Sequence, residues 1–118
     1  MQRFTELRVW QRSHAAALQV YRISSRFPID ERFGLTSQLR RAALSVPTNI
    51  AEGSKRVTSQ EYARFLNIAE GSVAETEYLL MVSRDLGYIS AKDASAQLRE
   101  FDEIARMLHS LRGKVGKI

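Results

Sequence analysis

Arginine residues recur along one side of the first predicted helix, and they are the side chains best suited to a chemical role. Arg8, Arg12, Arg22 and Arg26 share a face with Gln19, because separations of three, four and seven residues return to the same side of an α-helix. A guanidinium group pairs well with phosphate. This stripe predicts contacts with a nucleic-acid backbone without reading of the bases. A solvated or salt-bridged helix face is the alternative for this helix considered alone.

Further basic residues and an uneven charge distribution support the same hypothesis. Residues 1–59 carry ten Lys/Arg against four Asp/Glu, residues 60–118 carry eight against nine, and the whole chain has a net charge of +5. A basic half favours an anionic partner such as RNA or DNA. Positive charge that only keeps an assembly soluble would give the same composition. The further candidates are Arg40, Arg41, Lys55 and Arg56.

Other residue types offer little for catalysis. The sequence has no cysteine, which excludes disulfides and thiolate chemistry. His14 and His109 lie on different predicted helices, and neither has a carboxylate pair at metal-ligand spacing. No nucleophile elbow, phosphate loop or dinucleotide fingerprint occurs. We therefore expect a protein that is not an enzyme and uses no metal or cofactor. A site assembled between subunits is the one enzymatic hypothesis left open.

Four amphipathic helices are predicted to position these residues. Thr5 is the expected N-cap of the first helix, and Pro28 ends it. Thr58 and Glu61 have capping-box spacing at the start of the third helix, and Ser90 and Asp93 repeat this spacing at the start of the fourth. Residues 113–118 are expected to form a frayed basic tail. Short connections predict an all-α, antiparallel up-down-up-down four-helix bundle, in a single domain that spans residues 1–118. The predicted helices cover residues 6–26, 34–53, 59–86 and 91–112.

The first helix carries more apolar surface than one bundle core requires. It has two ridges, which together exceed the roughly 100° apolar stripe of a helix that packs on one core. We therefore expect one ridge to form an interface between copies of the chain, and the sequence leaves open which one. One ridge contains Val9, Ala16, Val20, Ile23 and Phe27, and the other contains Leu7, Trp10, Leu18 and Tyr21. The interface candidates are Trp10, His14, Leu18 and Tyr21.

Proline and glycine inside the second and third helices indicate close packing. Pro47 removes a backbone donor from the second helix, and Gly53 leaves room for another helix near its end. Gly71 lies in the middle of the third helix, where glycine costs about 1 kcal/mol relative to alanine. We expect both Pro47 and Gly71 at close helix–helix contacts.

Several segments resemble a bacterial protein family. They are FTELRVWQRSHAAALQVYRIS, the pair Phe27–Pro28, the run from Leu35 to Gly53 that ends in SVPTNIAEG, and RFLNIAEGSVAETEYLL at Arg64–Leu80. Over about Phe4 to Leu111 the chain resembles the four-helix bundle proteins known as large-subunit rRNA intervening-sequence proteins. The elements NIAEG and GS-x-x-E make the resemblance specific. Here their marked residues are Asn49, Glu52, Gly53, Gly71, Ser72 and Glu75.

The resemblance implies a four-helix bundle that assembles into a ring-like homopentamer, and it brings no established biochemical activity. A related branch, the accessory variability determinants of diversity-generating retroelements, binds nucleic acid and a reverse transcriptase through a basic surface. We interpret Asn49, Glu52 and Gly53 as structural residues. An exposed contact made by Asn49 or Glu52 is the alternative, because polar residues near loops often serve function.

The leading hypothesis is a non-enzymatic homo-oligomer that binds RNA or DNA through its basic surface without sequence specificity. The alternative is an oligomeric scaffold for a protein partner, in which the positive charge is incidental. No segment has the pattern of a signal peptide or the roughly 18 apolar residues of a membrane helix. We therefore expect a cytoplasmic protein without a membrane partner.

Overall fold

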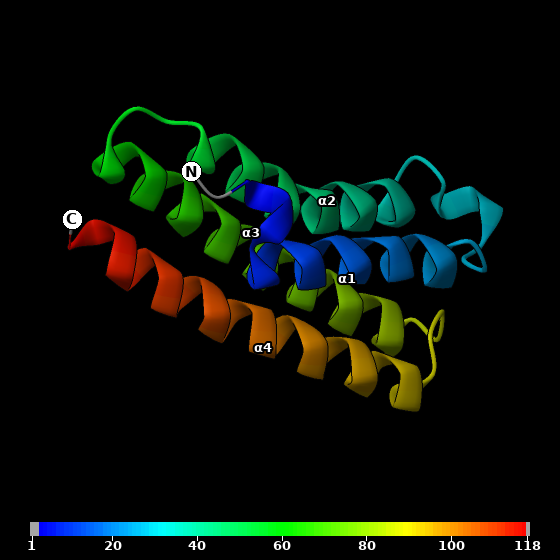
Figure 1. The fold of residues 1–118 in the computed structure, drawn as a ribbon. Helices are drawn as coiled ribbons and strands as arrows, with labels where there is room; N and C mark the ends of the chain where they lie inside the picture. Colours follow the sequence, from blue (N-terminus) through cyan, green and yellow to red (C-terminus); the bar gives the residue numbers. More distant parts are fainter. Residues whose placement is uncertain (1–2, 118) are drawn as a thin grey trace.

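The computed structural model describes residues 3–117, which form four α-helices in an antiparallel bundle (Figure 1). Short 3₁₀ turns at Phe4–Glu6 and Ile29–Glu31 precede the first and second helices. Figure 1 shows α1 between α2 and α4, with α3 behind it, so each helix packs on its two neighbours. The predicted all-α up-down-up-down fold is confirmed. The helices are α1 (Arg8–Ser24), α2 (Leu35–Ser54), α3 (Ser59–Asp85) and α4 (Ala91–Gly116).

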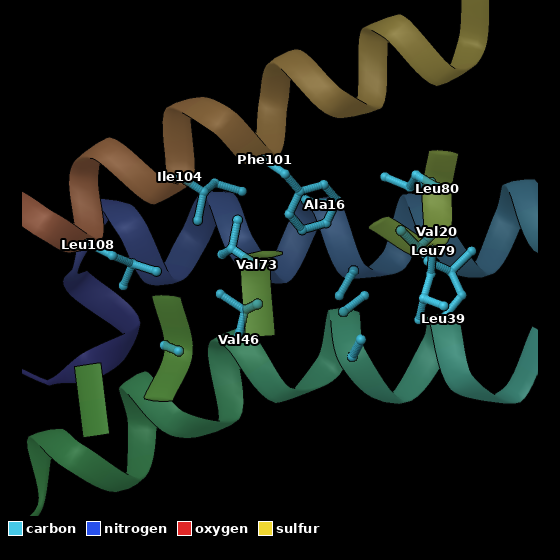
Figure 2. Packing of buried hydrophobic residues seen from close by; sticks show 14 of the residues in the cluster. Ala16, Val20, Leu39, Val46, Val73, Leu79, Leu80, Phe101, Ile104 and Leu108 are labelled. Carbon is cyan, nitrogen blue, oxygen red and sulfur yellow. The ribbon is translucent and has the colours of Figure 1, made fainter. Parts of the chain in front are cut away.

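Apolar side chains from all four helices meet in the interior of the bundle (Figure 2). The largest fully buried side chain is Phe101 of α4. Leu39 of α2 and Leu80 of α3 are also fully buried, and burial of one such side chain stabilises the fold by roughly 1.5–3 kcal/mol. Val46 and Ile50 of α2 are fully buried as well. Leu39, Val46 and Ile50 are separated by seven and four residues, so they lie on one face of α2.

Packing distinguishes the two apolar ridges of α1. Val9 and Val20, from one ridge, are 5% and 0% exposed, and this ridge faces the core. Leu18 and Tyr21, from the other ridge, keep 40% and 37% of their surface exposed. Leu7 and Trp10 of this second ridge are partly buried and pack against the core, so its surface part consists of Leu18 and Tyr21.

The start of α1 differs from the sequence prediction. Thr5 is not the N-cap, because it lies inside the 3₁₀ turn Phe4–Glu6, and α1 begins only at Arg8 with Leu7 as its N-cap. Two contacts hold this turn in place. The Gln11 side chain donates a hydrogen bond to the Thr5 carbonyl at 2.9 Å, and the Phe4 ring packs edge-on against Trp10 at 5.2 Å. These contacts hold the residues before α1 in place, although no side chain caps the start of the helix.

The end of α4 is also different, because the predicted frayed tail is helical to Gly116. Val115 is only 7% exposed. It follows Leu108 by seven residues, which places both on one face of the helix, and its burial offsets the low helix propensity of Gly113 and Gly116.

Two side-chain caps appear where the sequence places them. The Thr58 hydroxyl oxygen accepts a hydrogen bond from the Glu61 amide at 3.1 Å, and the Ser90 hydroxyl oxygen accepts one from the Asp93 amide at 3.1 Å. Each bond satisfies an amide that lacks an intrahelical partner. These caps mark the first residues of α3 and α4.

The hexapeptide NIAEGS occurs twice, at residues 49–54 and 67–72, and the two copies have different surroundings. A Cβ atom added at Gly53 would lie 2.7 Å from Cβ of Phe65 and 3.2 Å from Cδ1 of Tyr62. At Gly71 the same atom would meet nothing within 4 Å. The expected close contact inside one chain is therefore present at Gly53. It is wrong at Gly71, because that face of α3 points away from the core.

We predict that Gly53→Ala lowers the free energy of unfolding by about 1–3 kcal/mol, because the added methyl group forces α2 and α3 apart. Gly113→Ala is the matched control. Gly113 is helical and has no neighbour within 4 Å of an added Cβ, so this change should raise stability by up to about 1 kcal/mol. Urea unfolding measures both values. Equal effects of the two substitutions would contradict the close contact at Gly53.

Candidate nucleic-acid interface

Arg12 does not belong to a free basic stripe, because it forms an ion pair with α4. Its Nη2 and Nε atoms donate to the two carboxylate oxygens of Glu100 at 2.6 and 3.1 Å. Both side chains are only about a third exposed, at 32% and 35%. The hydrogen bond to Glu100 raises the pKa of Arg12 above its ordinary value. The salt-bridged alternative therefore applies to Arg12, since Glu100 occupies two of the guanidinium nitrogens that would bind phosphate.

The other arginines of the predicted stripe remain exposed on α1 and just after it. Arg8 lies at the start of α1, while Arg22 and Arg26 lie at its opposite end. Arg22 donates a hydrogen bond to Oε1 of Gln19 at 3.1 Å. The Arg12–Glu100 pair separates these two groups, so the stripe is divided into two basic regions.

Arg40 and Arg41 of α2 have different environments. Arg40 is half-buried and connects α2 to α1, since its Nε donates to Oγ of Ser24 at 2.8 Å and its guanidinium lies 4.6 Å from the centre of the Tyr21 ring. Arg41 is exposed. Arg40 is thus partly committed to the fold, whereas Arg41 is available to a partner.

Lys55 and Arg56 follow α2 at the end of the bundle where α1 begins. Both are exposed. Arg56 donates from Nε to the Glu52 carbonyl at 3.2 Å and lies 5.3 Å from the centre of the Phe65 ring. A cation beside the C-terminal carbonyls of a helix is favourable, so Arg56 has a structural role in addition to its charge.

Sequence analysis missed Lys114, because it placed this residue in a frayed tail. In the structure Lys114 lies on α4 and lines an open hollow of about 390 Å³ together with Arg8. Apolar side chains such as Leu7, Met107 and Leu111 form the rest of this hollow. The sequence does contain a signal that Lys114 is helical. Val115 follows Leu108 and Leu111 by seven and four residues, so the helical period continues through Lys114.

Ion pairing is concentrated on α3 and α4. In the described residues, Arg84 pairs with Asp85 at 3.0 Å, Arg106 pairs with Asp102 at 2.6 Å, and Arg112 pairs with Glu70. Of the eight predicted binding residues only Arg12 has such a carboxylate partner. The excess positive charge of the first half of the chain is therefore not neutralised within the bundle.

Comparison with protein-family models identifies the family of this chain. The model for the 23S rRNA-intervening sequence protein matches residues 5–110. The chain belongs to this family. A crystal structure of a protein of unknown function from the S23 ribosomal protein family of Bacteroides thetaiotaomicron has a similar fold, with a TM-score of 0.79 and 24% sequence identity. The alignment covers 88% of this chain and 97% of the other. No curated protein matches this sequence.

Three of the family's marked residues, Asn49, Gly53 and Ser72, lie where α2 packs on α3. The Asn49 side-chain amide donates to the Ser45 carbonyl at 2.8 Å and to the Ser45 hydroxyl at 2.9 Å. That hydroxyl lies 2.8 Å from the Ser72 hydroxyl. Asn49 and Ser72 are thus joined through Ser45, and this small network fixes the register of α2 against α3. Pro47 is buried beside it, whereas Glu52 and Glu75 are exposed.

The histidines lie apart on the surface of this family member. His14 is exposed and stacks on Trp10 at 4.9 Å between ring centres. His109 is exposed, with Nδ1 located 3.7 Å from Oε1 of Glu70. Within residues 3–117 no three His, Cys, Asp or Glu side chains are placed to hold a metal ion. No helix of this part of the chain is long and apolar enough to span a bilayer.

We predict that Arg12→Glu lowers the free energy of unfolding by about 1 kcal/mol, because a carboxylate would then face Glu100. Arg26→Glu, on the same helical stripe but without a carboxylate partner, should change stability by less than about 0.5 kcal/mol. Exchange of the two charges, Arg12→Glu with Glu100→Arg, should recover most of the loss. Urea unfolding of the wild type, the two single variants and the double variant measures the free energy of unfolding of each. If the exchange recovered nothing, the ion pair would not stabilise the bundle.

Proposed function

We propose that this protein is a non-enzymatic homo-oligomer that binds the backbone of RNA or DNA through the basic surface of α1 and α2, without sequence specificity. One observation carries the proposal. Within the described residues Arg84, Arg106 and Arg112 of α3 and α4 are paired with carboxylates, whereas no carboxylate is paired with the exposed cations of the first half of the chain, namely Arg8, Arg22, Arg26, Arg41 and Lys55. Unpaired cations attract polyanions by releasing counterions from the phosphate backbone.

The distribution of these cations favours contact with a backbone rather than with bases. The described chain is 45 Å long, and the exposed cations occur near both ends and along the outer side of α2. A nucleic-acid strand has one phosphate for about every 3.4 Å of duplex axis, so several phosphates fit along this length. Exposed arginine and lysine side chains that contact phosphate groups do not distinguish one base sequence from another. Because the family name refers to a 23S rRNA intervening sequence, RNA should be tested beside DNA.

Self-assembly is the second part of the proposal. The second apolar ridge of α1 leaves Leu18 and Tyr21 exposed on the single chain, with the partly buried Trp10 on the same ridge. Large uncovered apolar regions usually mark contact sites. A ring-like homopentamer, which the family resemblance implies, would cover this region. The absence of cysteine fits a reducing compartment, and we place the assembly in the cytoplasm.

A scaffold for another protein is the second candidate function. The observation in its favour is the same apolar ridge, because it could receive a protein partner instead of another copy. In that case the unpaired cations would serve solubility alone. Salt-dependent binding of nucleic acid separates the two functions.

We predict that the combined substitution of Arg26, Arg41 and Lys55 by glutamate weakens binding of mixed-sequence RNA and DNA. The slope of log affinity against log salt should become shallower by about 0.7–0.9 for each phosphate contact removed. These side chains are exposed, so each change should cost less than about 0.5 kcal/mol of stability. Fluorescence anisotropy at several salt concentrations measures the slope.

The matched control replaces Lys92, Arg99 and Lys117 by glutamate. These residues are exposed on α4 or directly after it, and the change in net charge is the same. The control should bind with nearly the wild-type slope. Equal weakening of both variants would show that only net charge matters, and absence of salt-dependent binding by the wild type would favour the scaffold.

We also predict that the wild-type chain is oligomeric at micromolar concentration, since the α1 ridge should be covered. Multi-angle light scattering measures the mass directly. A mass of 13.4 kDa, that of one chain, would contradict self-assembly.

A further inference from the structure

A small hollow lies at the turn between α1 and α2, at one end of the bundle (Figure 1). Its volume is about 150 Å³. Since one water molecule takes up roughly 30 Å³ of the liquid, the hollow has room for about five heavy atoms, which is the size of a phosphate group. Phe27, Pro28 and Ile29 form an apolar wall, and the other side chains that line the hollow are serine, threonine and arginine.

Two arginine side chains line this hollow, and neither has a carboxylate partner among the described residues. Arg40, half-buried on α2, donates from Nε to the Ser24 hydroxyl at 2.8 Å and from Nη2 to the Tyr21 carbonyl at 3.3 Å. A guanidinium group has five N–H donors, so these two bonds leave three for a ligand. Arg32, which precedes α2, is exposed. Both cations are therefore open to an anion in the hollow.

Thr36 of α2 supplies an unused hydroxyl in the same place. Its side chain lines the hollow and is only 6% exposed, yet its hydroxyl takes part in none of the hydrogen bonds around this turn in the described chain. The serine hydroxyls there are already engaged. Ser24 donates to the Tyr21 carbonyl at 3.3 Å, and Ser25 donates to the Arg22 carbonyl at 2.6 Å. Because a buried hydroxyl without a partner costs free energy, an acceptor in the hollow would stabilise Thr36.

The acidic side chains of the turn do not line the hollow. The Glu31 carboxylate accepts hydrogen bonds from the Leu35 amide at 3.2 Å and from the Tyr88 hydroxyl at 2.9 Å. Asp30 is exposed and forms no ion pair within the described residues. The hollow thus combines two cations and a donor hydroxyl without a carboxylate among them, and this combination suits an anionic ligand.

These donors suit a phosphate at the end of a chain better than one within it. A phosphate monoester has three free oxygens and a charge of about −1.5 to −2 at pH 7. A phosphodiester has fewer free oxygens and a smaller charge, and a strand continues on both of its sides. The monoester can therefore enter a hollow of this size and present one oxygen to each guanidinium group and one to the hydroxyl.

Features beside the hollow favour the end of a strand over a free phosphate. The Phe33 ring is 85% exposed, and the Arg32 guanidinium lies 4.7 Å from its centre. Exposed aromatic rings bind unstacked bases by stacking. Arg26 and Arg41, to which the proposed function assigns backbone contacts, lie near the same end of α1 and α2. A strand whose end enters the hollow would thus find a stacking surface and further cations nearby.

We propose that this hollow binds the phosphate monoester at the end of an RNA or DNA strand, with Arg32, Arg40 and Thr36 as its donors. The inference rests on the proposed function and adds a defined site to a surface that otherwise responds to charge alone. A strand with a terminal phosphate then binds more tightly than the same strand with terminal hydroxyl groups.

The test compares short single-stranded oligonucleotides of one mixed sequence, as RNA and as DNA, by fluorescence anisotropy. They carry a 5′-phosphate, a 3′-phosphate or hydroxyl groups at both ends. We predict that one phosphorylated form binds the wild type about tenfold more tightly than the hydroxyl form, because hydrogen bonds to a charged group are strong. A hydroxyl-ended strand that is one nucleotide longer controls for the added charge, and it should bind nearly as the shorter hydroxyl strand does.

Two variants alter the hollow, and a third is the matched control. Thr36→Val removes the hydroxyl and keeps every charge, so it should reduce the preference for the phosphorylated strand severalfold. Arg32→Gln should do the same, and because Arg32 is exposed this variant does not depend on a buried side chain. Arg41→Gln removes the same charge outside the hollow and should weaken binding of both strands while their ratio stays the same. Circular dichroism verifies that each variant is folded.

Equal affinity of the wild type for phosphorylated and hydroxyl strands would overturn the proposal, and so would an unchanged preference in both hollow variants. Adenosine monophosphate is the second probe. It should displace the phosphorylated strand weakly, and if it bound as tightly as that strand, the hollow would be a site for free nucleotides instead. Salt-dependent binding of all strands without a preference would leave the proposed function standing. Absence of binding to every strand would overturn both.

Discussion

The close contact of α2 with α3 is the constraint on which the rest of the bundle depends. Gly53 has no Cβ, so the backbone of α2 can approach Phe65 of α3 more closely than any other residue would allow. Further along the same helices, the Ser45 and Ser72 hydroxyls are within hydrogen-bond distance of each other. A close approach at one point and a polar contact at another fix how far α3 is rotated and shifted against α2. This rotation turns Leu66 and Val73 into the core and leaves the opposite side of α3 at the surface.

The charge distribution follows from the same arrangement. Helices α3 and α4 lie side by side, and their acidic and basic side chains neutralise one another, as Arg112 does with Glu70. Helices α1 and α2 have few carboxylates. Of the basic residues predicted to bind nucleic acid, only Arg12 is paired with a carboxylate of α4, that of Glu100. The α3–α4 side of the bundle therefore carries charges of both signs, whereas the α1–α2 side is basic. Leu18 and Tyr21 of α1 are exposed on the basic side, so the proposed self-assembly and polyanion binding would use neighbouring surfaces of α1 and α2.

Much of the fold could be predicted because its determinants are local. Apolar periodicity predicted four amphipathic helices and the two apolar ridges of α1, of which one faces the core. The hydroxyls of Thr58 and Ser90 marked two helix starts through bonds to amides three residues away. The failures involved distant partners. Glu100 lies 88 residues from Arg12, so no local pattern indicated that this arginine would be paired. Thr5 lost its role as a cap because Gln11 and Trp10 hold the preceding turn.

The repeated hexapeptide NIAEGS separates what local sequence decides from what tertiary structure decides. Both copies are helical, because the residues of the hexapeptide and its neighbours allow helix formation in either place. Their surroundings are opposite: Ile50 is fully buried while Ile68 is 41% exposed, and Gly53 is buried while Gly71 is exposed. Local sequence sets backbone conformation through dihedral preferences and nearby hydrogen bonds. Which side of the helix faces inward depends on apolar residues many turns away and on the neighbouring helix. The same six residues therefore serve as a packing contact in α2 and as open surface in α3.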